Sequence, residues 1–364
     1  MQLYSGKMYM LTSPLHGSSA DGTVNPTQND PGLDRTAGNP FNTDPVNIDE
    51  LVQAFRHRGG VIIFLHNPKA GGSTVRELIQ SQAYEVRNGD KLHQINPQNA
   101  KNNIAYWGTH TVTSWKASKL RIDALLSQQA QSANGTIFIL EDHVFPDIIN
   151  VLIPSLKKWR AKSKANNIPL LVVAQIREPV SHFVSYFNYY HVRTQKAAPT
   201  QESLVKFARE NENLQCQWFV NRVCPNDNII IMRQLLQLVL HEIDWIFDTA
   251  TFAQELLPLL TYMTKLQLRD LGIVQPVGYY DYHGEKLKVI DLSQETLRIL
   301  REQSVLDREL YDNVTRHYRD FSKWRDYLTA KKAFTKCSWY PENQTCVYPG
   351  GEAVSPGNLP AYLL

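Results

Sequence analysis

The stretch FLHNPKAGGSTV, residues 64–75, determines the interpretation of the whole chain. It continues the apolar run VIIFL (61–65), which is typical of a buried strand, and leads into STVRELIQSQ, which is typical of a helix. A glycine-rich turn between a strand and a helix presents backbone N–H groups and the positive end of the helix dipole to an anion. In the usual P-loop, G-x-x-x-x-G-K-[ST], the lysine follows the glycines. Here Lys69 precedes Gly71 and Gly72, so we predict a phosphate-binding loop of a different kind.

Apolar runs alternate with helical patterns along the central part of the chain. Four runs are predicted to be buried strands: 61–65, 136–144, 170–176 and 228–232. Continuous Val, Ile and Leu runs separated by helices are typical of a parallel sheet covered on both faces. Further along, helical spacing predicts one or two long amphipathic helices that carry Leu306, Leu310, Val314, Phe321 and Leu328. The predicted fold class is α/β, a parallel sheet flanked by helices.

The two ends of the chain differ in composition from this central part. Residues 1–47 are rich in Gly, Ser, Thr, Asn, Asp and Pro, which predicts a flexible N-terminal stem or tail. Residues 349–364 form a second loose segment. We therefore expect a single folded domain over residues 48–348.

Charge and hydropathy exclude some classes of protein. The formal net charge of +3 is small for 364 residues, so we expect no general binding of nucleic acid. The sequence has no apolar run of 18 or more residues and no signal peptide at its start. We expect a soluble chain that reaches a membrane only through an anchor outside this sequence.

The cysteines form two close pairs, Cys216 with Cys224 and Cys337 with Cys346. Neither pair has the spacing of a zinc or thioredoxin site. Reduced, partly buried thiols are one interpretation. Three N-glycosylation sequons, at Asn134, Asn313 and Asn343, favour an oxidising compartment with disulfides instead.

A second anion site is predicted at REPVSHFVS, where Arg177 ends a strand and Pro179 suits the first turn of a helix. Ser181 and Ser185 then lie four residues apart on one helix face. The guanidinium fork matches phosphate oxygens, although pairing of Arg177 with Glu178 is an alternative.

A candidate base is predicted in LEDHVF (140–145), where His143 lies at or just past a strand end. Its ordinary pKa near neutrality suits a general base, and Glu141 and Asp142 could orient its ring. A structural or solvated histidine is the alternative. Ligands of open parallel sheets bind beyond the carboxyl ends of the strands, where all three features fall.

Together, these features resemble the carbohydrate sulfotransferases that use 3′-phosphoadenosine 5′-phosphosulfate (PAPS), especially the Golgi heparan sulfate 2-O and chondroitin group. PKAGGST is similar to their phosphosulfate loop, and the spacing from Arg177 to Ser185 is similar to their 3′-phosphate motif. The resemblance covers roughly residues 60–325 and implies a P-loop NTPase-like sulfotransferase domain in the Golgi lumen.

The resemblance also implies roles for individual residues. Lys69 and His143 would be catalytic, Lys69 at the leaving phosphate and His143 as the base. The PAPS-binding residues would be Lys69, Ala70, Gly71, Gly72, Ser73, Thr74, Arg177 and Ser185. No metal is expected, because the sulfuryl group carries less charge than a γ-phosphoryl group and no carboxylate-ending strand of the Walker B kind is evident beside the loop. The acceptor would be a carbohydrate, an acidic polysaccharide or glycosaminoglycan-like glycan.

The sequence departs from the family at two positions. His182 stands where a second arginine is usual, and Glu141 stands where a basic or aromatic residue is common. Candidate acceptor contacts are Trp107 and Trp115, the basic cluster His191, Arg193 and Lys196, and a disulfide-closed loop at 216–224. Core tryptophans and a solvated charged loop are the alternative interpretation. Alternatives are a P-loop small-molecule kinase, a non-catalytic nucleotide- or glycan-binding relative, and a cytosolic sulfotransferase of phenols or steroids.

Overall fold

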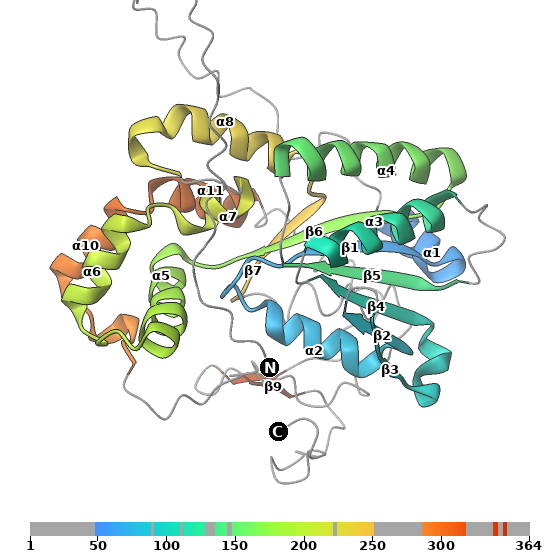
Figure 1. Cartoon of the computed structure of the whole chain (residues 1–364), viewed down its shortest axis with the longest axis horizontal. Helices are drawn as coiled ribbons and strands as arrows, with labels where there is room; N and C mark the ends of the chain where they lie inside the picture. Colours follow the sequence, from blue (N-terminus) through green and yellow to red (C-terminus); the bar gives the residue numbers. More distant parts are fainter. Residues whose placement is uncertain are drawn as a thin grey trace, which may run out of the picture.

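The central feature of the fold is one twisted, mostly parallel sheet (Figure 1). The computed structural model describes residues 48–88, 91–109, 112–127, 135–143, 148–220, 224–250, 286–317, 338–340 and 345–347. Within these ranges seven strands pair in the order β3-β2-β4-β5-β1-β6-β7. The strands are β1 (Gly60–Leu65), β2 (Glu85–Asn88), β3 (Lys91–Ile95), β4 (Ile104–Thr109), β5 (Ile137–Asp142), β6 (Leu170–Ile176) and β7 (Trp245–Asp248). Within this sheet only the β2–β3 pair is antiparallel. The α/β prediction is confirmed at this level.

Helices cover both faces of the sheet. Figure 1 shows α3, α4 and α8 along one face and α2 along the other. The larger helical layer consists of α3 (Val112–Ser127), α4 (Ile153–Asn166), α7 (Leu214–Val220), α8 (Ile229–Leu240) and α11 (Val305–His317). The remaining helices are α1 (Ile48–Arg58), α2 (Gly72–Gln82), α5 (Pro179–Phe187), α6 (Gln201–Glu210) and α10 (Gln294–Glu302). Shorter elements are η1 (Pro97–Asn102), η3 (Ile148–Leu152), η4 (Asn188–Thr194), η5 (Asn226–Asn228), η7 (Val289–Asp291) and the hairpin β8 (Ser338–Tyr340) with β9 (Thr345–Val347).

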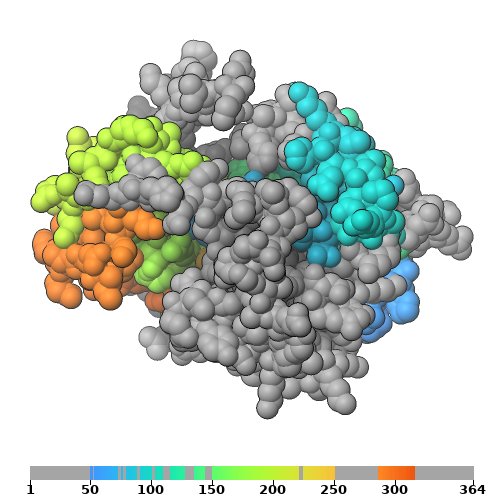
Figure 2. Space-filling model, turned by 90° about the horizontal axis from the view of Figure 1, so that it is seen from below, coloured from blue at the N-terminus to red at the C-terminus, as the bar shows by residue number. Residues whose placement is uncertain are grey.

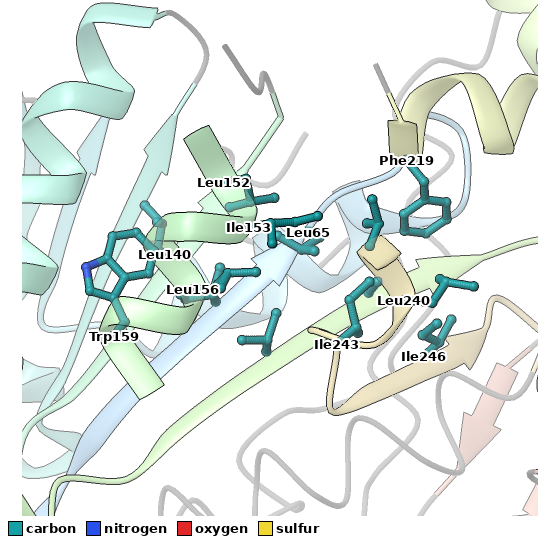
Figure 3. Packing of buried hydrophobic residues seen from close by; sticks show 14 of the residues in the cluster. Leu65, Leu140, Leu152, Ile153, Leu156, Trp159, Phe219, Leu240, Ile243 and Ile246 are labelled. Atoms are coloured by element: carbon teal, nitrogen blue, oxygen red, sulfur yellow. The ribbon is translucent and has the colours of Figure 1, made fainter. Parts of the chain in front are cut away.

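The main core lies between the sheet and the larger helical layer. Side chains alternate along each strand, so Val61, Ile63 and Leu65 of β1 all face this layer. Figure 3 shows Leu65 and Leu140 meeting Leu152, Leu156 and Trp159 from η3 and α4, with Phe219, Leu240 and Ile246 packed farther along the same layer. The continuous apolar sequence of the strands is thus explained by burial on both faces.

A second apolar cluster joins α5, α6 and α10. Its centre contains Phe183, Phe187 and Phe207, and the ring centroids of Phe183 and Phe207 are 6.2 Å apart in an edge-on arrangement. In Figure 2, α6 in yellow-green and α10 in orange gather at one end of the face, opposite the cyan side chains of the β2–β3 region. This cluster holds α5, which carries the second predicted phosphate motif, against the rest of the fold.

Three of the four predicted strands are confirmed as β1, β5 and β6, and the helix after the glycines is α2. The prediction of a strand at 228–232 is wrong, because these residues begin helix α8. The side chains that face the core from α8 recur at helical spacing: Ile229, Met232, Leu235, Leu236, Val239 and Leu240. Ile230 and Ile231 are exposed. A helical period over 12 residues therefore outweighs the β propensity of three consecutive isoleucines.

Four strands, β2, β3, β4 and β7, were not predicted from sequence. β2, β3 and β7 are short or lie at the edge of the sheet, where an uninterrupted apolar run is not required, and β4 is an interior strand whose sequence IAYWGT has two partly exposed positions and no continuous Val, Ile and Leu run. The predicted C-terminal helices are confirmed as α10 and α11, with Leu306, Leu310 and Val314 buried. Phe321, Leu328 and the ranges 1–47 and 349–364 lie outside the described residues. None of the described helices is long and apolar enough to cross a bilayer.

Two local signals fix the elements around the candidate site. Gly59 ends α1 in the left-handed region, with φ of 71°, and its N–H bonds to the carbonyl of Phe55 at 2.9 Å. The side chain of Glu178 caps α5 by accepting from the N–H groups of Val180 at 3.1 Å and Ser181 at 2.7 Å. Pro179 is the first residue of α5, as the sequence predicted. Glu178 is thus a helix cap, and no ion pair with Arg177 is formed.

Candidate functional site

The loop between β1 and α2 lies at the carboxyl edge of the sheet. It follows β1, an interior strand that pairs with β5 on one side and β6 on the other. Two residues have positive φ, Lys69 at 65° and Gly71 at 90°. The hydroxyl of Thr249, which follows β7, donates to the carbonyl of Ala70 at 2.5 Å and to that of Ile176 at 2.9 Å. The loop is therefore held by the ends of its neighbouring strands and opens into the N-terminus of α2.

Two cationic side chains lie over one aromatic ring at this loop, and a third contacts the loop backbone. The Nζ of Lys69 lies 4.2 Å from the ring centroid of Tyr189, and the guanidinium carbon of Arg193 lies 5.2 Å from it. Arg177, at the end of β6, donates from Nη1 to the carbonyl of Lys69 at 3.2 Å. The two predicted phosphate motifs thus lie in contact, and Arg193 lies beside them.

The electrostatics of this group follow from its burial. Burial, together with the charges of Arg177 and Arg193, lowers the pKa of Lys69 to about 8. Burial also lowers the pKa of Arg177, against the opposing effect of Glu178 and Asp248. Cations that are partly desolvated and mutually repelling gain from an anion, so the arrangement favours a phosphate-type ligand.

A buried amide joins the ends of β1 and β6. Oε1 of Gln215 accepts from the side-chain amide of Asn67 at 3.1 Å and from the backbone N–H of Arg177 at 2.9 Å. Its Nε2 donates to the carbonyl of Arg177 at 2.9 Å. Asp307 of α11 in turn accepts from the N–H groups of Gln215 and Cys216 at the start of α7. This joint was not predicted, since a glutamine in LQCQWF carries no sequence signal for such a role.

His182 replaces the usual second arginine with a structural contact. Its side chain is buried, and its Nε2 lies 2.8 Å from the carbonyl of Pro68, to which it must donate. Burial lowers the pKa of His182 to about 3, so the ring is neutral at pH 7. The histidine therefore ties α5 to the loop.

The structure shows fewer contacts for the other residues predicted to bind the sulfuryl donor. Ser185 is partly exposed on α5, eight residues after Arg177. Ser73 and Thr74 lie in the first turn of α2, and their side chains fall outside the described part of the structure. Beneath the loop, both amide atoms of the buried Gln175 lack partners among the described residues. A Cβ on Gly71 would lie 2.8 Å from its Nε2.

His143 lies at the end of β5 in a compact polar cluster. Its Nε2 is 2.9 Å from Oε1 of Glu141, and the same oxygen pairs with Nδ1 of His66. Tyr106 donates its hydroxyl to the other oxygen, Oε2. The rings of His66 and His143 are 3.7 Å apart. Glu141 is fully buried, His66 is 3 % exposed, and the side chain of His143 is 19 % exposed.

The charge of this cluster resides on the carboxylate. Burial lowers the pKa of His66 to about 4, so the ring is neutral at pH 7. Burial alone would raise the pKa of Glu141, but its contacts with the two histidines outweigh that effect and lower it. A buried anion with imidazole on one oxygen and phenol on the other is stabilised by hydrogen bonds, since no lysine or arginine among the described residues pairs with it in a salt bridge.

One sequence-based statement about this strand is wrong. β5 pairs directly with β1 and ends in Glu141 and Asp142, so a carboxylate-ending strand does stand beside the loop. The apolar residues of β5 were sufficient to predict a strand. Its pairing with β1 depends on the order of strands in the sheet, which a single sequence does not reveal. Both carboxylates have partners: Glu141 is held as described, and Asp142 accepts from the hydroxyl of Thr109 on the neighbouring strand.

The predicted acceptor contacts are only partly brought together. Trp115 is buried and packs against Trp159 with ring centroids 5.9 Å apart, so it belongs to the core. Trp107 is partly buried and packs edge-on against Phe138. Instead of forming a cluster with Arg193, His191 packs against Phe207, with 4.4 Å between the centroids.

The predicted disulfide between Cys216 and Cys224 is not formed. Both thiols are free and buried, and the neighbouring Cys224 raises the pKa of Cys216. Cys337 and the side chain of Cys346 lie outside the described residues, as do the sequons at Asn134 and Asn343. Asn313 is exposed on α11.

The two glycines of the loop have different physical roles. Gly71 adopts a positive φ, whereas Gly72 is helical and its missing side chain makes room for His66. A Cβ on Gly72 would lie 2.3 Å from Nε2 of His66. The glycine therefore couples the loop to the histidine cluster.

We expect Gly72→Ala to lower the free energy of unfolding by about 1–3 kcal/mol, the usual cost of overpacking. Alanine is otherwise about 1 kcal/mol better than glycine within a helix, so the clash must outweigh that preference. In a His66→Ala background the penalty should vanish. Urea denaturation of the four proteins measures the coupling energy. Equal effects of Gly72→Ala in both backgrounds would contradict the contact.

Similarity to known proteins adds nothing to this geometry. Comparisons with family models, with curated proteins and with solved structures give no match. The function must therefore be inferred from the two motifs, the cations at the loop and the cluster around His143.

Proposed function

We propose that the chain is a PAPS-dependent carbohydrate O-sulfotransferase built on a P-loop-like sheet and working in the Golgi lumen. The observation that carries the proposal is the contact between the two phosphate motifs: Arg177 donates to the carbonyl of Lys69 at the carboxyl edge of β1 and β6. A donor with a 5′-phosphosulfate and a 3′-phosphate requires two adjoining anion sites. ATP lacks the second of these groups.

The donor is held by this chain's own cations and backbone. Lys69 and the N–H groups of residues 71–74 would bind the 5′-phosphosulfate, with the dipole of α2 adding to the attraction. Arg177 and Ser185 would bind the 3′-phosphate, as their spacing in the motif suggests. The unpartnered amide of Gln175 beneath Gly71 agrees with a ligand above it.

The transfer step needs a base and a stabilised leaving group. The acceptor oxygen forms a bond to sulfur while the bond from sulfur to the 5′-phosphate oxygen breaks, leaving adenosine 3′,5′-bisphosphate. His143 takes the acceptor proton. Its Nε2 lies 2.9 Å from Oε1 of Glu141, a carboxylate that can stabilise the imidazolium that forms. Lys69 stabilises the charge that develops on the departing phosphate.

The acceptor is an acidic glycan in this proposal. Support comes from Arg193, whose guanidinium shares the ring of Tyr189 with Lys69 and so stands beside the reacting end of the donor. A cation at that place can pair with a carboxylate or sulfate of the acceptor. The aromatic ring adds an apolar face on which a sugar can pack.

A small-molecule kinase is the second candidate, and one observation favours it. β5 ends in two carboxylates beside β1, the place where P-loop kinases hold Mg²⁺ through a Walker B aspartate. Against it, Lys69 precedes the glycines, and both carboxylates are engaged by His66, Tyr106 and Thr109. The two candidates differ in the nucleotide that they bind.

Transfer of labelled sulfate from PAPS to a panel of desulfated polysaccharides, with simple phenols alongside, tests the activity directly. We expect label in the polysaccharides and none in the phenols. Label only in phenols would replace the glycan acceptor by a small aromatic one. Failure of transfer to every acceptor, together with phosphoryl transfer from ATP, would establish the kinase instead.

Nucleotide preference can be measured without any acceptor. Adenosine 3′,5′-bisphosphate at about 100 times its Kd should stabilise the fold by roughly 2.7 kcal/mol, while ATP with Mg²⁺ should have little effect. Lys69→Ala should lose most of this stabilisation, and Lys116→Ala, which removes an exposed lysine of α3, should keep it. Stronger stabilisation by ATP with Mg²⁺ would reverse the assignment.

Donor affinity should fall with rising pH, because Lys69 loses its proton near pH 8. Below that pH the ammonium is present and the affinity for adenosine 3′,5′-bisphosphate is greatest. At pH 9 only about a tenth of the free protein keeps the charge, so the affinity should be roughly tenfold lower than at pH 7. The phosphate groups are already ionised over this range. Calorimetric titration of Lys69→Arg, whose charge persists, is the control and should show no such fall.

His143→Ala should lower sulfuryl transfer by about 10²-fold or more without weakening donor binding. The reason is that the base acts on the acceptor and makes no contact with the bisphosphate. Steady-state transfer rates and the Kd for adenosine 3′,5′-bisphosphate separate the two effects. His57→Ala, at an exposed position of α1, is the matched control. Unchanged turnover in His143→Ala would remove His143 from the mechanism.

A further inference from the structure

The cluster around Glu141 has a feature that general-base catalysis does not require. Two imidazole nitrogens, Nδ1 of His66 and Nε2 of His143, converge on one carboxylate oxygen. The three donor atoms lie within 4.8 Å of one another. A base needs one orienting partner, whereas a second histidine on the same oxygen completes a three-ligand set.

The surroundings hold these ligands in place as the neighbours of a metal site do. Tyr106 donates to the free oxygen of Glu141, which fixes the carboxylate. The ring of His66 stacks on Phe64 with centroids 5.6 Å apart and lies against the backbone of Gly72. Glu141 and His66 are buried, and the partly exposed side of the cluster is at His143, which leaves a path for an ion.

We propose that His66, Glu141 and His143 form a Zn²⁺ site that inhibits the chain when it is occupied. Two histidines and one glutamate are an established ligand set for Zn²⁺, with a fourth position left to water. Metal–ligand bonds of about 2.0–2.2 Å place the donor atoms of a tetrahedral site about 3.3–3.5 Å apart. Nε2 of His143 lies 2.9 Å from Oε1 of Glu141 and Nδ1 of His66 lies closer to it, so both histidines must move away from this oxygen to admit the ion.

Inhibition follows from the tautomers of His143, and this part depends on the proposed transferase function. Without metal, the neutral ring carries one hydrogen and keeps one nitrogen lone pair that can accept the acceptor's proton. A metal on Nε2 takes the lone pair of that nitrogen, so the hydrogen of the neutral ring must reside on Nδ1. The same ring cannot then act as a base, and the ion switches off proton transfer while leaving Lys69 and Arg177 in place.

Metal binding is tested with Zn²⁺ alone, on protein first stripped of metal and in competition with a fluorescent zinc chelator. We expect one tight equivalent, weakened by about tenfold or more in His66→Gln, since even outer-shell changes cost 10–100-fold. His57→Gln, at an exposed position, should bind as the wild type does. Equal affinity in wild type and His66→Gln would overturn the site.

A second measurement guards against misfolding of the variant. Co²⁺ bound to the wild-type chain should give a visible absorption band typical of nitrogen and oxygen ligands in a low-coordinate site, and Zn²⁺ should displace it. An absence of this band in folded wild-type protein would also overturn the site. This readout requires neither a variant nor any activity.

The inhibitory consequence is measured as the ratio of sulfuryl transfer with and without saturating Zn²⁺. The ratio should fall at least tenfold in the wild type and stay near one in His66→Gln at the same Zn²⁺ concentration. Zinc binding without a change in this ratio would overturn the inhibition. If metal-free protein transfers no sulfate, the proposed function fails, while the two binding measurements still decide the metal site.

Discussion

The candidate site depends on one buried side chain, Gln215, which holds two strand ends at a fixed distance. Its amide satisfies the side chain of Asn67, in the loop after β1, and both backbone polar groups of Arg177, after β6. All of these groups are in or near the interior, where an unpaired donor or acceptor costs about 1–3 kcal/mol. Replacing Gln215 by an apolar residue would leave three such groups without a partner. The relative position of Lys69 and Arg177 is therefore determined by hydrogen bonding beneath the site, before any ligand arrives.

The joint is itself fixed from the helical layer. Asp307, buried on α11, accepts from the N–H groups of Gln215 and Cys216 in the first turn of α7 and so fixes the position of Gln215. Burial raises the pKa of Asp307 to about 7, against the opposing effect of these two hydrogen bonds. The carboxylate is thus an energetically costly cap that the fold retains. This cap fixes the position of α7, and through Gln215 it also fixes the distance between the two proposed anion sites.

Sequence alone predicted the elements whose signals are local. The strands β1, β5 and β6 are continuous apolar runs, and Pro179 marks the start of α5. The error at 228–232 arose where β-branched residues lie within a longer helical period. Contacts that join distant segments were not predictable: Lys69 and Arg193 share the ring of Tyr189 only because the π-helical turn after α5 brings that ring back over the loop.

The histidine cluster is a second set of contacts between distant segments that the sequence did not predict. Glu141 looked like a departure from the sulfotransferase pattern near the predicted base. In the structure, the side chains of His66, Tyr106 and His143 all contact the carboxylate of Glu141. His66 directly follows β1 and Glu141 lies in β5, so only the pairing of β1 with β5 brings them together.

Gly72 links this cluster to the phosphate loop, because the first turn of α2 rests directly on the ring of His66. An anion that attracts the N-terminus of α2 must also shift the backbone that packs against the ring of His66. Conversely, an ion that moves His66 toward itself changes the space beneath the loop. The second glycine of the predicted phosphate motif therefore has a role that the motif itself does not indicate, because it gives a histidine room below the loop. The proposed donor loop and the proposed base cluster are in this way packed against each other through Gly72 and His66.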